Sequence, residues 1–208
     1  MSESLLVTVL PFVLMPLLTV VIVYFAIKME RKQMNKVINF YKLYADKFGL
    51  SYFPESKGIL WNYTYPYVYG KLDNFEIKLY SYKTGGKNKT TYTDLSIYYQ
   101  GNLEEFKIAR NKLFQKIGKA FGAQDIVIGN PELDELYVFK SKDEAFLQGL
   151  IDRDVQELLI HLKSFIVFPL EAKKGRFNHS LIGHMDTEQK LENFEKLTVL
   201  MLKILKKI

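Results

Sequence analysis

The sequence contains no cysteine at all. This absence excludes disulfide bonds, thiolate zinc sites and cysteine nucleophiles, and it fits a chain that works in a reducing compartment. Histidine is scarce, with three residues, and no low-complexity tract or repeat of fixed period is present. Repeat architectures and disulfide-stapled scaffolds are therefore excluded as fold classes.

No catalytic or metal-binding motif is recognisable. The sequence Gly85-Gly86-Lys87 lacks the surroundings of a phosphate-binding loop, because Ser81 and Asn88 stand where that motif requires a glycine and a serine or threonine. His179, His184 and Asp186 do not have the spacing of metal ligands, and Ser164 and Ser180 lack the context of a nucleophile. We therefore expect no cofactor and no metal, and the sequence favours a binding protein over an enzyme.

Charge is missing from one long stretch. Residues Leu5 to Ile27 form an uncharged run that, at about 1.5 Å per residue, is long enough for the roughly 30 Å core of a bilayer. A cleavable signal peptide would need a basic start and a small-residue cleavage site, and neither is present. The sequence predicts a short extracytoplasmic N-terminus (1–4) and a transmembrane helix (5–27).

Basic residues follow this run at once. Lys28, Arg31, Lys32 and Lys36 lie on its C-terminal side, and no lysine or arginine precedes it. The positive-inside rule then predicts a single-pass protein of the inner or plasma membrane, with its N-terminus outside and its C-terminal domain in the cytoplasm. The same four residues are expected to contact anionic lipid, so the bilayer is a predicted partner.

The net charge of +6 does not indicate a nucleic-acid partner. Half of it belongs to residues 1–48, where six lysines and arginines stand against three acidic residues. Residues 28–49 are predicted to form a juxtamembrane basic amphipathic helix that ends at Gly49, with apolar positions Met34, Val37, Ile38, Tyr41, Tyr44, Ala45 and Phe48. Packing of that apolar stripe on the domain is favoured over contact with lipid headgroups.

Residues 50–208 are predicted to form one cytoplasmic α+β domain of antiparallel sheet packed with helices. The alternation of residues 75–82 indicates a strand, with 91–100 as its partner and 83–89 as the hairpin tip. Further strands are expected at 126–128, 136–139, 164–170 and 176–182. Helices are expected at 103–121, after caps at Asp143 and Asp152, and at the C-terminus after Asp186 and Gln189 in a capping box. Blocks of strands followed by helices are typical of α+β proteins.

The stretch around residues 61–69 is unusually aromatic. Trp61 is followed by Tyr63, Tyr65, Tyr67 and Tyr69 at alternating positions. Such a pattern serves either as a recognition surface or as a set of core and cross-strand pairs, and the second is the more frequent use.

The loop at 130–135 allows two interpretations. Asp125, Glu132, Asp134 and Glu135 could act as general acids, bases or ligands of a hard cation. Alternatively, Asn130 caps a short helix that begins at Pro131, and Asp134 accepts hydrogen bonds from backbone amides in the bend. The structural interpretation is favoured because no further oxygen-ligand spacing appears.

The region from Phe121 to Leu159 resembles a family of uncharacterised prokaryotic membrane-anchored proteins. The match rests on Phe121-Gly122, Asp125-Ile126, Gly129 to Asp134, Tyr137 to Lys140, Leu150, Asp154-Val155 and, earlier, Gly70 with Asp73-Asn74-Phe75. In those relatives a Gly-Asp-Pro-x-Phe-Asp stretch precedes a strand, whereas this chain has Asn130 and Leu133 at two of its positions. The resemblance implies an anchored domain without a known activity.

Together these features predict a membrane-anchored protein whose cytoplasmic domain is an interaction or scaffolding module for another membrane-associated protein. Two alternatives stay open. One is a sensor of lipid headgroups that uses residues 28–47 and the basic tip 83–89, and the other is a hydrolase or metal-dependent enzyme built on the acidic loop 130–135.

Overall fold

The structure, a computed structural model, describes residues 3–57, 63–85, 89–101, 104–111 and 125–208, with side chains omitted for 3–14 and 56–64. The described chain forms an α+β fold around an eight-stranded sheet in which every pairing is antiparallel. The strands, in spatial order, are β1 (Ser51–Phe53), β4 (Tyr67–Leu72), β5 (Phe75–Lys83), β6 (Thr91–Tyr98), β10 (Arg176–Ile182), β9 (Leu170–Lys173), β7 (Phe106–Arg110) and β8 (Tyr137–Ser141). A separate pair joins β2 (Ser56–Lys57) and β3 (Tyr63–Thr64).

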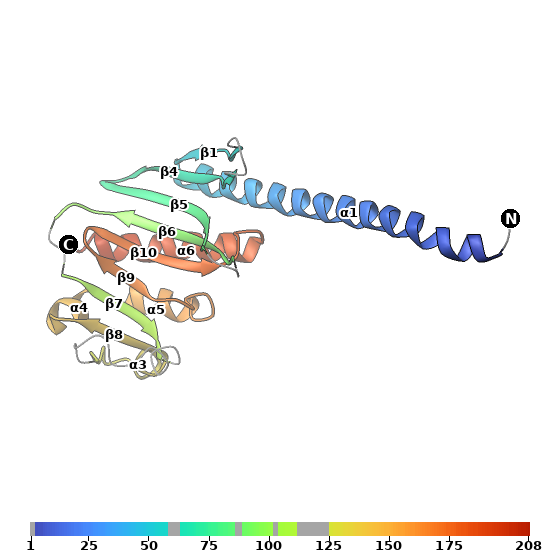
Figure 1. The fold of residues 1–208 in the computed structure, drawn as a ribbon. Helices are drawn as coiled ribbons and strands as arrows, with labels where there is room; N and C mark the ends of the chain where they lie inside the picture. The colour runs from blue at the N-terminus through green and yellow to red at the C-terminus, as the bar shows by residue number, and fades with distance from the viewer. Residues whose placement is uncertain (1–2, 58–62, 86–88, 102–103, 112–124) are drawn as a thin grey trace.

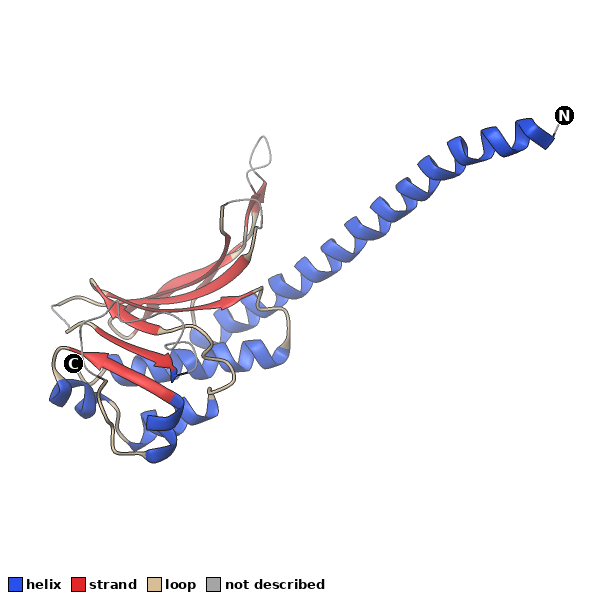
Figure 2. Cartoon of the chain, turned by 60° about the horizontal axis from the view of Figure 1, so that its bottom comes forward, coloured by secondary structure: helices blue, strands red, loops and turns tan. Residues whose placement is uncertain are grey.

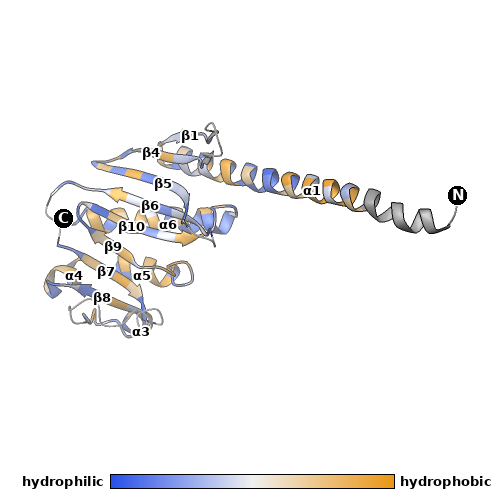
Figure 3. Ribbon diagram, viewed as in Figure 1, coloured by the Kyte–Doolittle hydropathy of each residue, from blue (hydrophilic) through white to orange (hydrophobic). Residues whose placement is uncertain are grey.

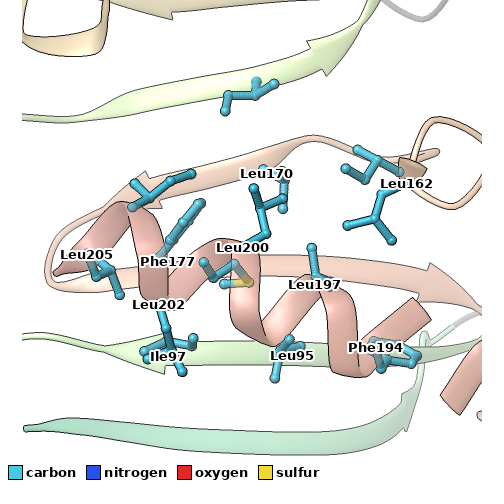
Figure 4. Close-up of a cluster of buried hydrophobic side chains, with 14 of the residues drawn as sticks. Leu95, Ile97, Leu162, Leu170, Phe177, Phe194, Leu197, Leu200, Leu202 and Leu205 are labelled. Atoms are coloured by element: carbon cyan, nitrogen blue, oxygen red, sulfur yellow. The ribbon is translucent and has the colours of Figure 1, made fainter. Parts of the chain in front are cut away.

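The helices gather on one side of this sheet (Figures 1 and 2). They are α1 (Glu3–Phe48), α3 (Pro131–Leu136), α4 (Glu144–Leu150), α5 (Arg153–His161) and α6 (Glu188–Leu205). Ile77 and Leu79 of β5 pair with Ile97 and Leu95 of β6, and all four side chains are fully buried on the helix side. Figure 4 shows the side chains of α6 meeting this face. The α+β class predicted from the sequence is therefore confirmed.

The second half of α1 belongs to the domain. Val37, Tyr41, Tyr44 and Ala45 are completely or almost completely buried, at the helical spacing read from the sequence. The helix ends at Phe48 because Gly49 takes a left-handed conformation, with φ +63°, that ends helices readily. The predicted stripe packs on the sheet and on α6. This agrees with the prediction that the stripe packs on the domain and not on lipid headgroups.

The first half of α1 projects away from the domain (Figure 1), and here the sequence prediction needs correction. In the part of the chain that the structure describes, no helix is sufficiently long and apolar to cross a membrane. The prediction of a transmembrane helix at residues 5–27 is therefore wrong. The predicted location and orientation of the chain stay predictions.

Three strands lie where the alternation of residues placed them. The predicted strands at 75–82, 91–100 and 176–182 correspond to β5, β6 and β10. The helix predicted at 103–121 is wrong in its described part, because residues 106–110 form strand β7. Phe106 and Ile108 of β7 are buried next to β8 and β9, and their spacing of two residues is that of a strand. The same stretch also fits the spacing of an apolar helical stripe. The positions from 112 to 121 lie outside the described residues.

Smaller corrections concern segment ends. Of residues 126–128 only Ile126 bridges to Phe139, and the strand expected at 164–170 begins only at Leu170. The cap of α6 is Thr187, whose hydroxyl accepts a hydrogen bond from the amide of Lys190 at 3.3 Å. Asp186 is engaged elsewhere, in an ion pair with the Lys190 ammonium at 2.7 Å.

His179 gives the core a measurable dependence on pH. The imidazole is completely buried beside the ring of Phe165, and this burial lowers the pKa of His179 from 6.5 to about 4. The unfolded chain therefore binds a proton more readily than the folded chain, so stability is lost as pH falls below about 6.5. Between pH 7.5 and 5.5 we expect a loss of about 1.4 kcal/mol from this residue.

The measurement is urea unfolding at the two pH values. His179→Leu should remove most of this loss, leaving the smaller contribution of half-buried His184, whose pKa is also lowered by burial. His161→Gln is the matched control, because His161 is exposed at the end of α5 and its replacement should leave the loss intact. An equal pH dependence in wild type and His179→Leu would contradict the assignment.

Candidate functional site

The sheet face opposite the helices carries a band of aromatic side chains. Because neighbouring residues of a strand point to opposite faces, burial of Ile77, Leu79 and Ser81 toward the helices places the intervening residues of β5 on the open face. We define the tyrosine face as the set of side chains at corresponding positions of four adjacent strands, namely Phe53, Tyr67, Lys78, Tyr80, Tyr82 and Tyr92. Tyr69 and Tyr98 flank it and are also exposed.

The rings of this face contact one another across the strands. Phe53 stacks on Tyr67 with their centroids 4.7 Å apart and their planes 7° apart. Tyr82 stacks on Tyr92 at 5.6 Å and also meets Tyr80 at 5.8 Å. Cross-strand aromatic pairs of this kind stabilise a sheet and hold the rings in fixed positions.

Lys78 lies within the aromatic band. Its ammonium nitrogen is 5.0 Å from the centroid of the Tyr80 ring and 5.6 Å from that of Tyr67, which are distances of cation–π contacts. Within the described ranges no carboxylate pairs with Lys78, whereas the neighbouring Lys71 pairs with Glu76 at 3.7 Å.

Next to the tyrosines lies a buried carboxylate, which the sequence reasoning missed. Asp94 is 2% exposed and accepts hydrogen bonds from Arg176 at 2.8 Å, Ser180 at 2.8 Å, Asn178 at 3.4 Å and Ser96. Arg176 also donates to Ser96 at 2.9 Å and to the Tyr80 hydroxyl at 3.3 Å. The only signal in the sequence is an aspartate inside a strand of apolar and aromatic residues.

The acidic loop has the contacts of its structural interpretation. Asn130 caps α3, with its side-chain oxygen accepting from the amides of Glu132 and Leu133, and Pro131 is the first helical residue. Asp134 accepts from the amides of Ile128 at 2.8 Å and Gly129 at 3.0 Å. The other acids of the loop face different partners, since Asp125 pairs with Lys140 and Glu132 with Lys163.

The remaining predicted site residues are dispersed. His179 is in the core, His184 lies 4.9 Å from the ring of Tyr65, and Asp186 pairs with Lys190. No group of three or more potential metal ligands occurs among the residues searched, which are those the structure describes. Lys28, Arg31, Lys32 and Lys36 are all exposed on α1, between its apolar outer half and its docked half (Figure 3).

Comparisons with known proteins place this chain in no established family. No family model matches it, and no curated protein matches it. Among solved structures it is similar to the crystal structure of the mycobacterial trehalose monomycolate transport factor A, TtfA, with 10% identity over 80% of this chain and 95% of that chain and a TM-score of 0.43. A similarity this low assigns neither a family nor a function, and the resemblance to membrane-anchored proteins noted from the sequence stays a prediction.

We expect the loop at 130–135 to matter for stability. Asp134→Ala leaves two backbone amides without their acceptor, so it should lower the free energy of unfolding by about 1–2 kcal/mol, and Pro131→Ala should lower it by about 1 kcal/mol or less. Glu135→Ala, at an exposed neighbouring position, should change it by less than about 0.5 kcal/mol. Urea unfolding at pH 7.5 measures all three. An Asp134→Ala protein as stable as wild type would point instead to a functional carboxylate.

Proposed function

We propose that this chain is a protein-interaction module that binds its partner through the tyrosine face. The observation that carries the proposal is a rigid, partly exposed array of tyrosines with an embedded lysine on a sheet face that no described helix covers. Tyrosine and arginine supply most of the binding energy in many protein interfaces, because they offer large contact areas and polar ends at a small cost in side-chain entropy.

The position of the array on strands also supports this proposal. Binding sites on strands are held more accurately than sites on loops. Arg176 and Tyr80 are fixed further by the hydrogen bonds around Asp94, so little side-chain ordering remains to be done when a partner binds. The enzyme alternative has less support, since in loop 130–135 Asp134 accepts hydrogen bonds from backbone amides and Glu132 pairs with Lys163.

Site-specific photo-crosslinking in cells tests the binding face. A benzophenone amino acid in place of Tyr98, 36% exposed beside the tyrosine face, should give discrete crosslinked products with another protein. The same amino acid in place of Val199, 40% exposed on α6, is the matched control and should give none. Crosslinks from position 199 but none from position 98 would refute the tyrosine face as the binding surface.

A second observation favours association with lipid. We propose that the apolar segment of α1, residues 15–27, contacts the bilayer and brings the module to a membrane, where its protein partner also resides. Its large apolar side chains are exposed on every side of the helix, from 43% for Val21 to 68% for Val20. A helix that is apolar all round is normally buried in protein or lipid, and the four basic residues that follow suit an anionic headgroup layer. The proposal concerns contact with lipid and does not involve a helix that crosses the bilayer.

Flotation with vesicles of phosphatidylcholine and phosphatidylglycerol tests this association. The full chain should float with the vesicles, and the double variant Leu18→Asp, Ile22→Asp should stay in the dense fraction, because charged groups resist transfer into hydrocarbon. Both residues are more than half exposed, so neither change disturbs the core. Val127→Asp, Ile182→Asp is the control with equal added charge at exposed apolar positions outside α1, and it should float. A wild-type chain that does not float would refute lipid contact.

A further inference from the structure

We infer that the segment recognised by the tyrosine face is acidic, with a carboxylate of the partner protein paired to Lys78. This inference rests on the proposed function and adds the chemistry of the partner. Two properties of the face lead to it. Most ring faces already contact another ring or Lys78, and in the described part of the chain no carboxylate pairs with Lys78.

The aromatic rings leave little room for a stacking ligand. Tyr67 is bounded by Phe53 on the β1 side and by Lys78 on the β5 side. Tyr82 contacts both Tyr80 and Tyr92. Nucleobases bind protein surfaces by stacking on free faces of aromatic rings, whereas the rings of the tyrosine face contact one another. What remains available is the edges and hydroxyl groups of the rings.

The charged side chains of this surface differ in whether a group of opposite charge pairs with them. Arg176 is paired with Asp94, and Lys71 with Glu76. The groups that lie beside the ammonium of the half-buried Lys78, among the residues that the structure describes, are the rings of Tyr67 and Tyr80. A cation held in a partly desolvated aromatic setting binds an anion more strongly than a fully hydrated surface lysine does. An anionic group seated there, with phenol hydroxyls around it, would be paired and hydrogen-bonded at once.

The dimensions of the face fit an extended peptide. The array crosses four adjacent strands, which at about 4.8 Å per strand spacing gives a width near 14 Å. An extended chain covers that distance with about four residues at roughly 3.4 Å each. A short segment can therefore place a glutamate or aspartate at Lys78 and neighbouring side chains against Tyr82 and Tyr92.

Fluorescence anisotropy with the full chain and labelled octaglutamate tests the inference. Octaglutamate should bind, whereas octaglutamine and an eight-residue oligothymidylate should bind at least tenfold more weakly. Lys78→Gln should weaken octaglutamate binding at least tenfold, and Lys78→Arg, which keeps the charge, should retain it. Lys142→Gln removes an exposed lysine in the turn after β8, with the same change in net charge, and should weaken binding by less than twofold. Thermal melts of each variant verify folding.

Four outcomes would contradict the inference or the proposed function. Equal weakening by Lys78→Gln and Lys142→Gln means attraction to the overall positive charge alone and overturns the inference. Stronger binding of the oligothymidylate assigns the face to nucleic acid and also overturns it. If Lys78→Gln leaves both octaglutamate binding and the crosslinking at position 98 unchanged, the acidic partner is refuted while the protein-binding face stands. Absence of crosslinks from position 98 in a chain that keeps Lys78 would refute the proposed function itself.

Discussion

Two buried tyrosines dock α1 onto the sheet and onto α6. This docking determines which face of the sheet is covered and which face is exposed. The Tyr41 hydroxyl lies 2.8 Å from the Ser81 hydroxyl of β5, and the Tyr44 hydroxyl lies 2.6 Å from Thr198 of α6. Both phenols are completely buried, and burial raises the pKa of each well above its usual range. A buried hydroxyl without a partner costs about 1–3 kcal/mol, so these two bonds specify the position of α1 as well as stabilise it. With α1 and α6 held on one face, the tyrosines of the opposite face remain accessible.

On the open face, the buried carboxylate of Asp94 holds neighbouring side chains in position. An isolated charge inside a protein is unfavourable by several kcal/mol, and Asp94 is stable only because Arg176 and the side chains of β6 and β10 satisfy both of its oxygens. In return, the network fixes Arg176, and through it the Tyr80 hydroxyl. Lys78, two residues before Tyr80 on β5, takes no part in this network. The contrast between a satisfied aspartate and a lysine without a carboxylate explains why the face is rigid and still suited to an anion.

The sequence predicted those parts of the fold that depend on local periodicity. Strict alternation located β5, and the 3.6-residue stripe located the docked half of α1 and the turn at Gly49. The segment at 106–110 was mistaken for helix because its apolar residues satisfy both periods, and only its partners β8 and β9 decide between them. The Asp94–Arg176 pair joins residues 82 positions apart, and the open face exists because helices distant in sequence cover the other one. Such relations follow from tertiary packing, which a single sequence does not display.

The projecting part of α1 and the tyrosine face differ in how favourable their contact with water is. Helices gain most of their stability from packing of an apolar face, yet residues 15–27 of α1 expose large apolar side chains in all directions. Contact of this segment with water is therefore unfavourable. The tyrosine face is stable in water, since its rings contact one another and its hydroxyls can be hydrated. The proposed lipid contact at α1 would therefore be permanent, and the proposed protein contact at the sheet would be reversible. Because Tyr41 fixes α1 to β5 and Tyr44 fixes it to α6, the first contact would also orient the second.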